Sequence, residues 1–396
     1  MKIIMIEAFA IRKAPEAGPA YWGKRTWGGP AQTGAAELSS HYPSPHRRKY
    51  VYSNTIDTTL VRLTADDGRI GWGEAKAPVA PEVVKTIIDQ LLAPTVLGSD
   101  PREVTLLWER MYAGMRVRGH DTGFYLEAIS GIDIALWDLA AQSAGVPVHT
   151  LLGGCFRNPY RVYASGIPAL PLDAPAGEWE VLADTARAFA ARGFTGLKVA
   201  LGQGIEGDLK SVRVIRETLG DGFLLFADAA GVYDVGQALR IGRALENLNY
   251  GFFEMPIAPE FLDGYARLAG ELDIPLALDS LANRYQVKDF LTRGSLGVVQ
   301  PDVCRAGGIT ECRRIAELAD TFGVAFAPHV SIGSWIHFIA SAHLAVAMPN
   351  TMIGEYWCGN NPLGDPLADK PLRLQNGYLY APVEPGLGIK IRPEAI

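Results

Sequence analysis

Seven ionisable side chains recur along the sequence at intervals that could gather them around one active site. Each lies at the end of a short apolar run and follows the previous one by 23 to 30 residues. That interval accommodates one strand, one helix and their loops, so the seven would end successive parallel strands. They are Lys198, Asp228, Glu254, Asp279, Asp302, His329 and Glu355.

Three of these side chains predict a metal site. Asp228, Glu254 and Asp279 would end three adjacent strands, and the only basic residue in the same turns is Arg284. A single aspartate there could be a helix cap or an ion-paired group, but three converging carboxylates would repel one another without a cation. An all-oxygen ligand set favours Mg²⁺, with water and substrate completing the octahedron.

A histidine and an aspartate on the next strands predict a general base. A carboxylate beside an imidazole holds one tautomer and makes the ring a better proton acceptor. Asp302 and His329 would be so placed, next to the metal site. His337 and His343 fall on the helix that follows and are interpreted as packing residues.

The elements that must position these residues repeat from about residue 160 onward. Eight short apolar runs alternate with amphipathic helical segments, which indicates βαβ units and a parallel sheet. Eight units in about 200 residues favour a closed (β/α)₈ TIM barrel over an open doubly wound sheet, and the first turn has no GxGxxG pattern. The runs are 160–167, 194–201, 223–229, 249–255, 274–279, 297–302, 324–329 and 352–357.

The first 125 residues have a different pattern, which predicts an α+β N-terminal capping domain. Met1–Lys13 has a charged Glu7 in its middle and is interpreted as a first strand, not a secretion signal. The irregular stretch 15–48 is interpreted as a substrate lid. We therefore expect a cap over residues 1–125, a barrel over 126–357, and a C-terminal segment, 358–396, that returns to the cap.

Composition narrows the classes of function. The 396 residues carry a formal charge of −6, so there is no basic excess for nucleic acid, and no apolar stretch reaches the roughly 18 residues of a membrane span. The four cysteines form no CxxC pair, which suits a reducing cytoplasm. We expect a cytoplasmic protein with a small-molecule carboxylate substrate and no nucleic-acid or membrane partner.

Taken together, these residues resemble the enolase superfamily, and within it the mandelate racemase branch of the mandelate racemase / muconate lactonizing enzyme family. The resemblance extends to IDIALWDLAAQSAGVPVHTLLGG at 132–154, which looks like the helix leading into the family's first barrel strand. It implies a modified, enolase-like barrel and a shared half-reaction. A substrate carboxylate chelates Mg²⁺, a base removes the α proton, and the metal stabilises the enediolate.

The resemblance also implies individual roles and a departure from them. Lys198 would lie against the substrate carboxylate, Glu355 would hydrogen-bond to it, and His329 would take the proton. Racemases of the branch carry a second lysine two residues after the first, whereas this chain has Ala200. Asp279 replaces the more usual glutamate as the third metal ligand.

With one base on one face, the favoured reaction is syn dehydration of an acid sugar, an aldonate or aldarate, to a 2-keto-3-deoxy acid. Cycloisomerisation of an aldarolactone is the near alternative, because QPDVCRAGG at 300–308 also resembles the family's cycloisomerases. Racemisation or epimerisation of a hydroxy acid is disfavoured by Ala200. A metal-dependent hydrolase would need more histidine ligands, and a catalytically inactive sugar-acid binding protein remains the alternative from another class.

Substrate identity would depend on the lid, where Trp22, Arg25 and Trp27 are the candidate substrate-binding residues. Aromatic side chains there permit an aromatic hydroxy acid. Arg25, Arg116, Arg118 and His120 permit a polyhydroxylated or dicarboxylic acid, and the two classes stay open. The resemblance further implies a homo-oligomer.

Overall fold

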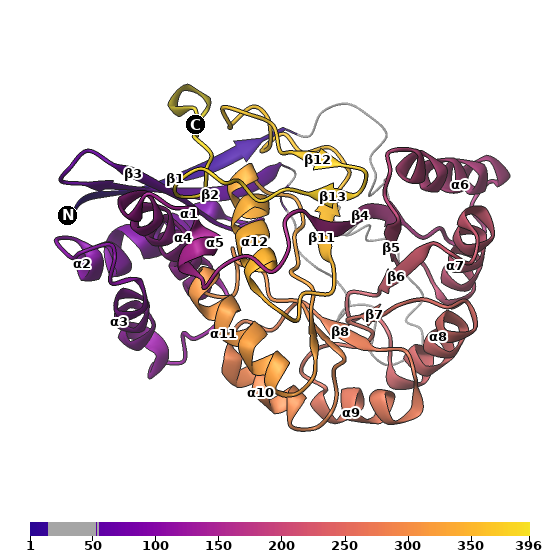
Figure 1. Cartoon of the computed structure of the whole chain (residues 1–396). Helices are drawn as coiled ribbons and strands as arrows, with labels where there is room; N and C mark the ends of the chain where they lie inside the picture. The colour runs from indigo at the N-terminus through magenta and orange to yellow at the C-terminus, as the bar shows by residue number, and fades with distance from the viewer. Residues whose placement is uncertain (15–52, 54) are drawn as a thin grey trace.

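The structure is a computed structural model that describes residues 1–14, 53 and 55–396. It has a cap, drawn in indigo to magenta in Figure 1, beside a larger barrel. The predicted fold class, a barrel with an α+β cap, is confirmed. Trp22, Arg25, Trp27 and the expected lid fall outside the described residues.

The cap is built on a three-stranded antiparallel sheet in the order β1-β2-β3. The predicted first strand is present, and one long helix, α4, packs directly on β3. A Cβ on Gly73 of β3 would collide with the carbonyl oxygen of Gly131 in α4, so glycine is required for this close approach. The cap elements are β1 (Ile3–Lys13), β2 (Ile56–Ala65), β3 (Ile70–Ala75), α1 (Pro81–Ile87), the π-helical turn η2 (Ile88–Leu92), α2 (Ala93–Val96), α3 (Val104–Arg116) and α4 (Phe124–Ala144).

All eight predicted barrel strands form, although several are shorter than their apolar runs. Seven of them lie in parallel order from β4 to β10, and β11 pairs with β4 on its other side. The ring closes where Phe326 donates its N–H to Asn350 O and accepts from Met352 N. The strands are β4 (Tyr160–Pro168), β5 (Gly196–Ala200), β6 (Leu224–Asp228), β7 (Phe253–Glu254), β8 (Leu276–Leu278), β9 (Val298–Val299), β10 (Ala325–Phe326) and β11 (Gly354–Trp357).

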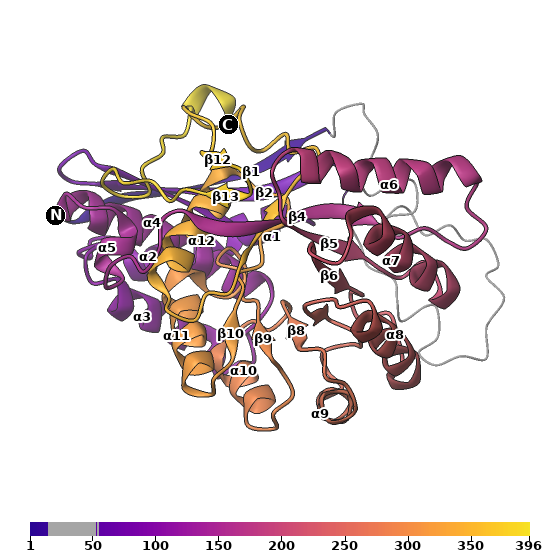
Figure 2. The ribbon, with the colours of Figure 1, turned by 45° about the vertical axis from the view of Figure 1, so that its right-hand side comes forward.

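Helices follow the strands around the outside of the barrel (Figures 1 and 2). Their starts follow from capping chemistry, since Asp234 and Gln237 form a capping box on α8, and Asn283 and Ser334 cap α10 and α12. These helices are α6 (Ala176–Ala191), α7 (Ile205–Leu219), α8 (Val235–Asn247), α9 (Leu262–Glu271), α10 (Arg284–Leu291), α11 (Gly308–Thr321) and α12 (Trp335–Ala347), while the short α5 (Val148–Leu151) precedes β4.

A separate apolar cluster fills the inside of the barrel below the strand ends. It contains the aromatic rings of Tyr163 on β4, Phe226 on β6 and Phe252, which directly precedes β7. The rings of Phe226 and Phe252 stack at a centroid distance of 4.2 Å. Smaller side chains from the other strands complete it. The barrel interior is therefore a packed core.

The C-terminal segment lies over both the barrel and the cap. It contributes the hairpin of β12 (Leu374–Gln375) and β13 (Tyr378–Leu379), which pairs antiparallel with the start of β4. The short 3₁₀ helix η3 (Pro393–Ala395) follows, and Lys13 of β1 donates a hydrogen bond to Ala395 O at 2.9 Å. Figures 1 and 2 both show this yellow segment above β1 and β2.

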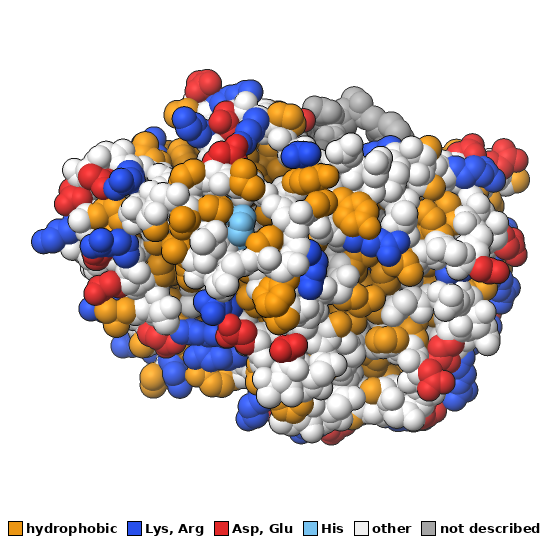
Figure 3. Space-filling model, viewed as in Figure 1, with side chains coloured by type: hydrophobic (Ala, Val, Ile, Leu, Met, Phe, Trp, Pro, Cys, Tyr) orange, Lys and Arg blue, Asp and Glu red, His pale blue; other side chains and the backbone are white. Residues whose placement is uncertain are grey.

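The surface carries interspersed charges on the face shown in Figure 3. Within the described ranges, none of the helices combines the length and apolarity that a bilayer span requires.

Candidate active site

The carboxyl ends of the barrel strands bring all seven sequence-predicted ionisable residues to one rim. Asp228 and Glu254 are neighbours in register on β6 and β7. Glu254 pairs with Ala277, so Asp279, two residues further along, points to the same side. Asp302 and His329 follow β9 and β10, and Glu355 lies on β11.

Lys198 holds the carboxylates of this rim together. Its Nζ lies 2.8 Å from Glu254 Oε2, 3.0 Å from Glu355 Oε1 and 3.7 Å from Asp228 Oδ2. The ammonium is buried, and although burial opposes its charge, Glu254 and Glu355 raise the pKa of Lys198 well above its usual range. Lys198 is therefore a fixed positive charge at the floor of the site.

The predicted metal ligands Asp228, Glu254 and Asp279 form an anionic corner that suits a divalent cation. Within the described part of the chain, ligand atoms of Glu254, Asp279 and His329 lie within 4.8 Å of one another, and Asp228 is not part of this group. Burial raises the pKa of Asp228 to about 6, with Asp279 adding to the rise, and it raises that of Glu254 well above its ordinary value. Among the described residues, buried Asp279 Oδ1 has no hydrogen-bond partner. Excess negative charge and an unused oxygen together fit an oxygen-ligated metal ion.

Arg284 does not supply the missing positive charge. The sequence places it in the turn after Asp279, but its guanidinium pairs with Glu311 and lies over the rings of Trp108 and Tyr285. It stabilises the junction of α10, α11 and α3 instead of the strand ends.

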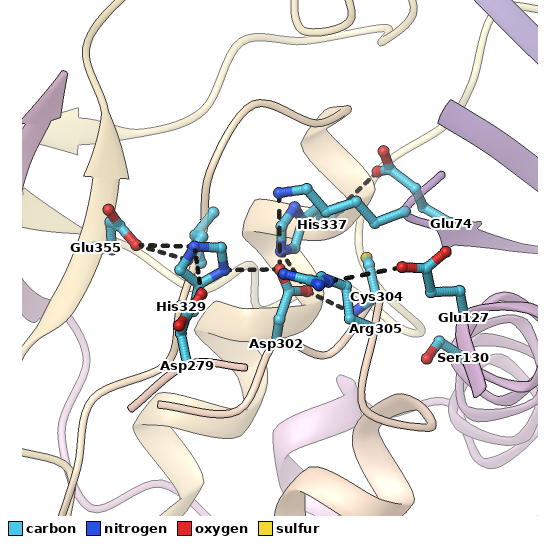
Figure 4. Close-up of polar contacts among 12 residues, drawn as sticks. Glu74, Glu127, Ser130, Asp279, Asp302, Cys304, Arg305, His329, His337 and Glu355 are labelled. Carbon is cyan, nitrogen blue, oxygen red and sulfur yellow. Dashed lines mark hydrogen bonds and ion pairs between the residues drawn. The ribbon is translucent and has the colours of Figure 1, made fainter. Parts of the chain in front are cut away.

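The imidazole of His329 is held by Asp302 and faces the carboxylate corner. Nδ1 lies 2.8 Å from Asp302 Oδ2, while Nε2 lies 3.7 Å from Asp279 Oδ2 and 3.9 Å from Glu355 Oε2 (Figure 4). Although burial opposes ionisation, His337, Lys76 and His329 keep the pKa of Asp302 well below its usual range. An ionised Asp302 can only accept, so Nδ1 carries the proton and Nε2 is free to take one.

Asp302 has more partners than the sequence indicates. Its Oδ1 accepts from Cys304 N at 2.8 Å and lies 2.9 Å from His337 Nε2. His337 was expected to be a packing residue, and it is instead a neighbour of the aspartate that orients His329. His343 does pack, against His149, and burial lowers its pKa to about 3.

Glu355 is fixed by groups on three sides of its carboxylate. Its Oε2 accepts from Val330 N at 3.0 Å, and Ser165 and Lys198 donate to it as well. Burial opposes its ionisation, but Lys198 and His329 lower its pKa to about 2. Glu355 is therefore an anion oriented between the lysine and the imidazole.

Sequence reasoning missed four further residues of the site. Gln300 donates a hydrogen bond to Glu254 Oε2 at 2.9 Å. The sequence could have indicated this residue, because it precedes Asp302 by two positions at the end of the same apolar run. Lys76 and Arg305 line the cavity, and Glu74 accepts hydrogen bonds from Ser334. Lys76 and Glu74 lie on the cap, where no barrel periodicity points to them.

A cavity of about 540 Å³ lies between barrel and cap. The barrel contributes Lys198, Asp228, Asp279, His329 and Glu355 to its wall. Arg116, Arg118 and His120, which the sequence offered for a dicarboxylic substrate, are exposed and do not line it.

Comparison with known proteins finds relatives that match most of the chain. D-galactarolactone cycloisomerase from Agrobacterium fabrum is 34% identical over 349 residues, covering 85% of this chain and 89% of the relative. Arabinonate dehydratase from Saccharolobus solfataricus is 33% identical, covering 87% and 91%. A racemase from Streptomyces coelicolor with bound magnesium superimposes with a TM-score of 0.81 at 26% identity, covering 98% and 97%.

Two family models together match most of the sequence. The model described as "Mandelate racemase / muconate lactonizing enzyme, N-terminal domain" matches residues 38–153. The model described as "Enolase C-terminal domain-like" matches residues 180–395. The chain therefore belongs to the mandelate racemase / muconate lactonizing enzyme family of the enolase superfamily.

Proposed function

We propose that the protein is a Mg²⁺-dependent lyase that removes the proton α to the carboxylate of an acid sugar and eliminates the β-hydroxyl, giving a 2-keto-3-deoxy acid. The observation that carries the proposal is the orientation of His329, whose Nδ1 is held by Asp302 while Nε2 faces the carboxylate corner. The dehydratase relative supports the same chemistry.

The metal site would be formed by Asp228, Glu254 and Asp279. When bound there, Mg²⁺ would supply Lewis-acid stabilisation of the negative charge that develops on the substrate carboxylate. The charge excess at this corner and the unpartnered oxygen of Asp279 support the assignment.

The protein's own groups account for the remaining requirements of the reaction. Lys198 places a permanent positive charge at the substrate carboxylate, where negative charge grows during deprotonation. His329 Nε2 accepts the α proton and can return it to the departing hydroxyl on the same face, which gives syn elimination. Glu355, ionised and hydrogen-bonded by Val330, can accept a hydrogen bond from a hydroxyl group of the bound acid sugar.

Position 200 argues against two-base racemisation. Ala200 ends β5 and has no titratable side chain, so the face opposite His329 has no base at that position. A racemase requires a base on each face of the reacting carbon.

Cycloisomerisation of an aldarolactone is the second candidate, favoured by the D-galactarolactone cycloisomerase relative. It begins with the same α-proton abstraction, so the two reactions differ only in which bond breaks next. A screen of acid sugars, their lactones and hydroxy acids with Mg²⁺ in D₂O, followed by NMR, separates the outcomes. Dehydration gives a 2-keto-3-deoxy acid, cycloisomerisation an isomeric acid or lactone, and racemisation a deuterated epimer.

The base assignment has its own test. We expect His329→Asn to abolish solvent exchange of the α proton while Mg²⁺ binding, followed by calorimetry, stays nearly unchanged. His120→Asn, at an exposed histidine outside the cavity, is the matched control. Turnover by His329→Asn would reject the assigned base, and binding of acid sugars without any α-proton exchange by the wild type would favour an inactive binding protein.

A further inference from the structure

The cap side of the cavity contains a short chain of hydroxyl groups that ends on a carboxylate. Ser53 and Thr55 lie just before β2, Asp57 lies on it, and all three line the cavity that also contains His329. Ser53 Oγ lies 2.8 Å from Thr55 Oγ1, and Thr55 Oγ1 donates a hydrogen bond to Asp57 Oδ1 at 2.5 Å. The proposed reaction uses none of these three side chains.

The direction of this hydrogen-bond chain follows from the number of protons available. A hydroxyl group has one proton to donate, and a carboxylate has none. Thr55 gives its proton to Asp57, so Thr55 Oγ1 can only accept from Ser53, and the proton of Ser53 lies in the bond between the two hydroxyl groups. The side chains of Ser53 and Thr55 therefore offer a ligand acceptors only.

Asp57 shares its cation with a second carboxylate. Arg12 Nε lies 3.4 Å from Asp57 Oδ2, while Arg12 Nη2 donates a hydrogen bond to Glu82 Oε2 at 2.8 Å. Arg12 is thus one positive charge between two carboxylates, and within residues 1–14, 53 and 55–396 no other lysine or arginine pairs with Asp57. An anionic group of a ligand would be repelled beside Asp57, whereas a hydroxyl group would not.

The lysine and arginine that line the described cavity wall besides Lys198 each face an acidic group of the protein. Lys76 Nζ lies 3.7 Å from Asp302 Oδ2, and Arg305 pairs with Glu127 (Figure 4). Their charges are therefore already matched by the protein. This part of the wall shows no excess of positive charge that would select a second carboxylate of the substrate.

We propose that Ser53, Thr55 and Asp57 form an acceptor subsite that binds the terminal hydroxyl group of an acid sugar, so that the substrate class is the aldonates. The inference rests on the proposed function, because the reacting carboxylate is taken to lie at Lys198 and the metal corner, which leaves the other end of the substrate toward the cap. An aldonate ends in a hydroxymethyl group, which has a proton to donate. The far carboxylate of an aldarate has none and would lie beside Asp57.

The kinetic test compares acids of the same stereochemistry that differ only at this end, galactonate with galactarate and gluconate with glucarate, in the presence of Mg²⁺. We expect the wild type to have the higher kcat/KM for the aldonate of the pair that it accepts. Ser53→Ala removes one neutral hydrogen bond and should lower the aldonate-to-aldarate ratio of kcat/KM by roughly 2- to 13-fold, mainly through KM. Ser143→Ala, at a serine of α4 outside the cavity, is the matched control and should leave the ratio unchanged.

Replacing Asp57 by asparagine tests the direction of the chain. Arg12 Nε needs an acceptor at the Oδ2 position, so the NH₂ group of Asp57→Asn takes the place of Oδ1 and donates to Thr55. Thr55 then donates to Ser53, which turns its proton toward the cavity, where it can bind a carboxylate. The aldonate-to-aldarate ratio should therefore fall through a gain for the aldarate, and Asp184→Asn, at an exposed aspartate of α6, is the control. A wild type that prefers the aldarate, equal losses for both acids in Ser53→Ala, or an unchanged ratio in folded Asp57→Asn would overturn the subsite.

A binding measurement distinguishes failure of the subsite from failure of the proposed function. Calorimetry of the Mg²⁺-loaded His329→Asn variant measures binding of both acids of a pair without turnover. A preference for the aldonate that is reduced on adding Ser53→Ala supports the subsite even if the wild type turns over neither acid. Turnover of acid sugars without any preference in binding would retain the proposed function and reject the subsite, and binding of neither acid in both pairs would overturn the subsite as well.

Discussion

Replacing Asp302 by asparagine should invert the proton arrangement on His329 without removing any metal ligand. Asp302 Oδ1 accepts from Cys304 N and Oδ2 accepts from His329 Nδ1, each at 2.8 Å. In Asp302→Asn the amide oxygen remains with the backbone N–H of Cys304, which leaves the NH₂ group facing Nδ1. The ring then accepts at Nδ1 and carries its proton on Nε2, where it cannot take the α proton.

The size of this effect follows from the loss of one tautomer and one buried charge. In another His–Asp pair the same replacement lowers turnover by about 10⁴ through the wrong tautomer. A factor of about 10⁴ corresponds to roughly 5 kcal/mol of activation free energy. We therefore expect kcat to fall by about 10⁴ with KM changed much less, because Asp302 does not lie in the cavity wall.

The assay is α-proton exchange in D₂O by NMR together with steady-state turnover. Asp138→Asn is the control, since Asp138 is a buried aspartate that accepts backbone hydrogen bonds from Trp72 and Leu387 outside the site. It should lower stability and leave kcat near the wild-type value. A folded Asp302→Asn protein that retains exchange within tenfold of the wild type would refute the role assigned to the pair.

Three further predictions concern the metal corner, pH dependence and packing. Asp228→Asn should weaken Mg²⁺ affinity in calorimetry, and an unchanged Kd would contradict the ligand assignment. Burial raises the pKa of Asp133 from 3.8 to about 7, although Thr310 hydrogen-bonds to it, so folding favours the protonated form and stability falls as the pH rises between these values. Urea unfolding at pH 4 to 8 should show this fall in the wild type and a flatter profile in Asp133→Asn, whereas parallel profiles would count against it. Gly73→Ala should lower the unfolding free energy by about 1–3 kcal/mol, because the new methyl group meets Gly131 O, and an unchanged denaturation midpoint would disprove that contact.

The barrel portion of the site could be predicted from sequence because its residues obey a local rule. Each polar residue ends an apolar run, and parallel strands bring those ends to one rim. Asp228, Glu254 and His329 are found this way although the strands themselves shrink to two residues at β7 and β10. The end of a buried apolar run therefore predicts which residues lie at the rim better than the number of residues in the hydrogen-bonded strand does.

The cap portion could not be predicted because its contacts are long-range and follow no repeat. Lys76 reaches Asp302 across 226 positions, and neither residue's neighbours indicate the pairing. His337 illustrates a different difficulty, because a histidine on an apolar helix resembles a packing residue. Only the approach of α12 to the end of β9 places its ring at Asp302.

Glu74 couples the integrity of the cap to the chemistry of the barrel. Its carboxylate accepts hydrogen bonds from Thr58 of the cap and from Ser334 and His337 at the first turn of α12. That turn carries the ring of His337 beside Asp302. Detaching the cap would therefore free the start of α12 and disturb the orientation of the His329 imidazole. A barrel without its cap would lose the position of its base as well as the cap side of the cavity wall.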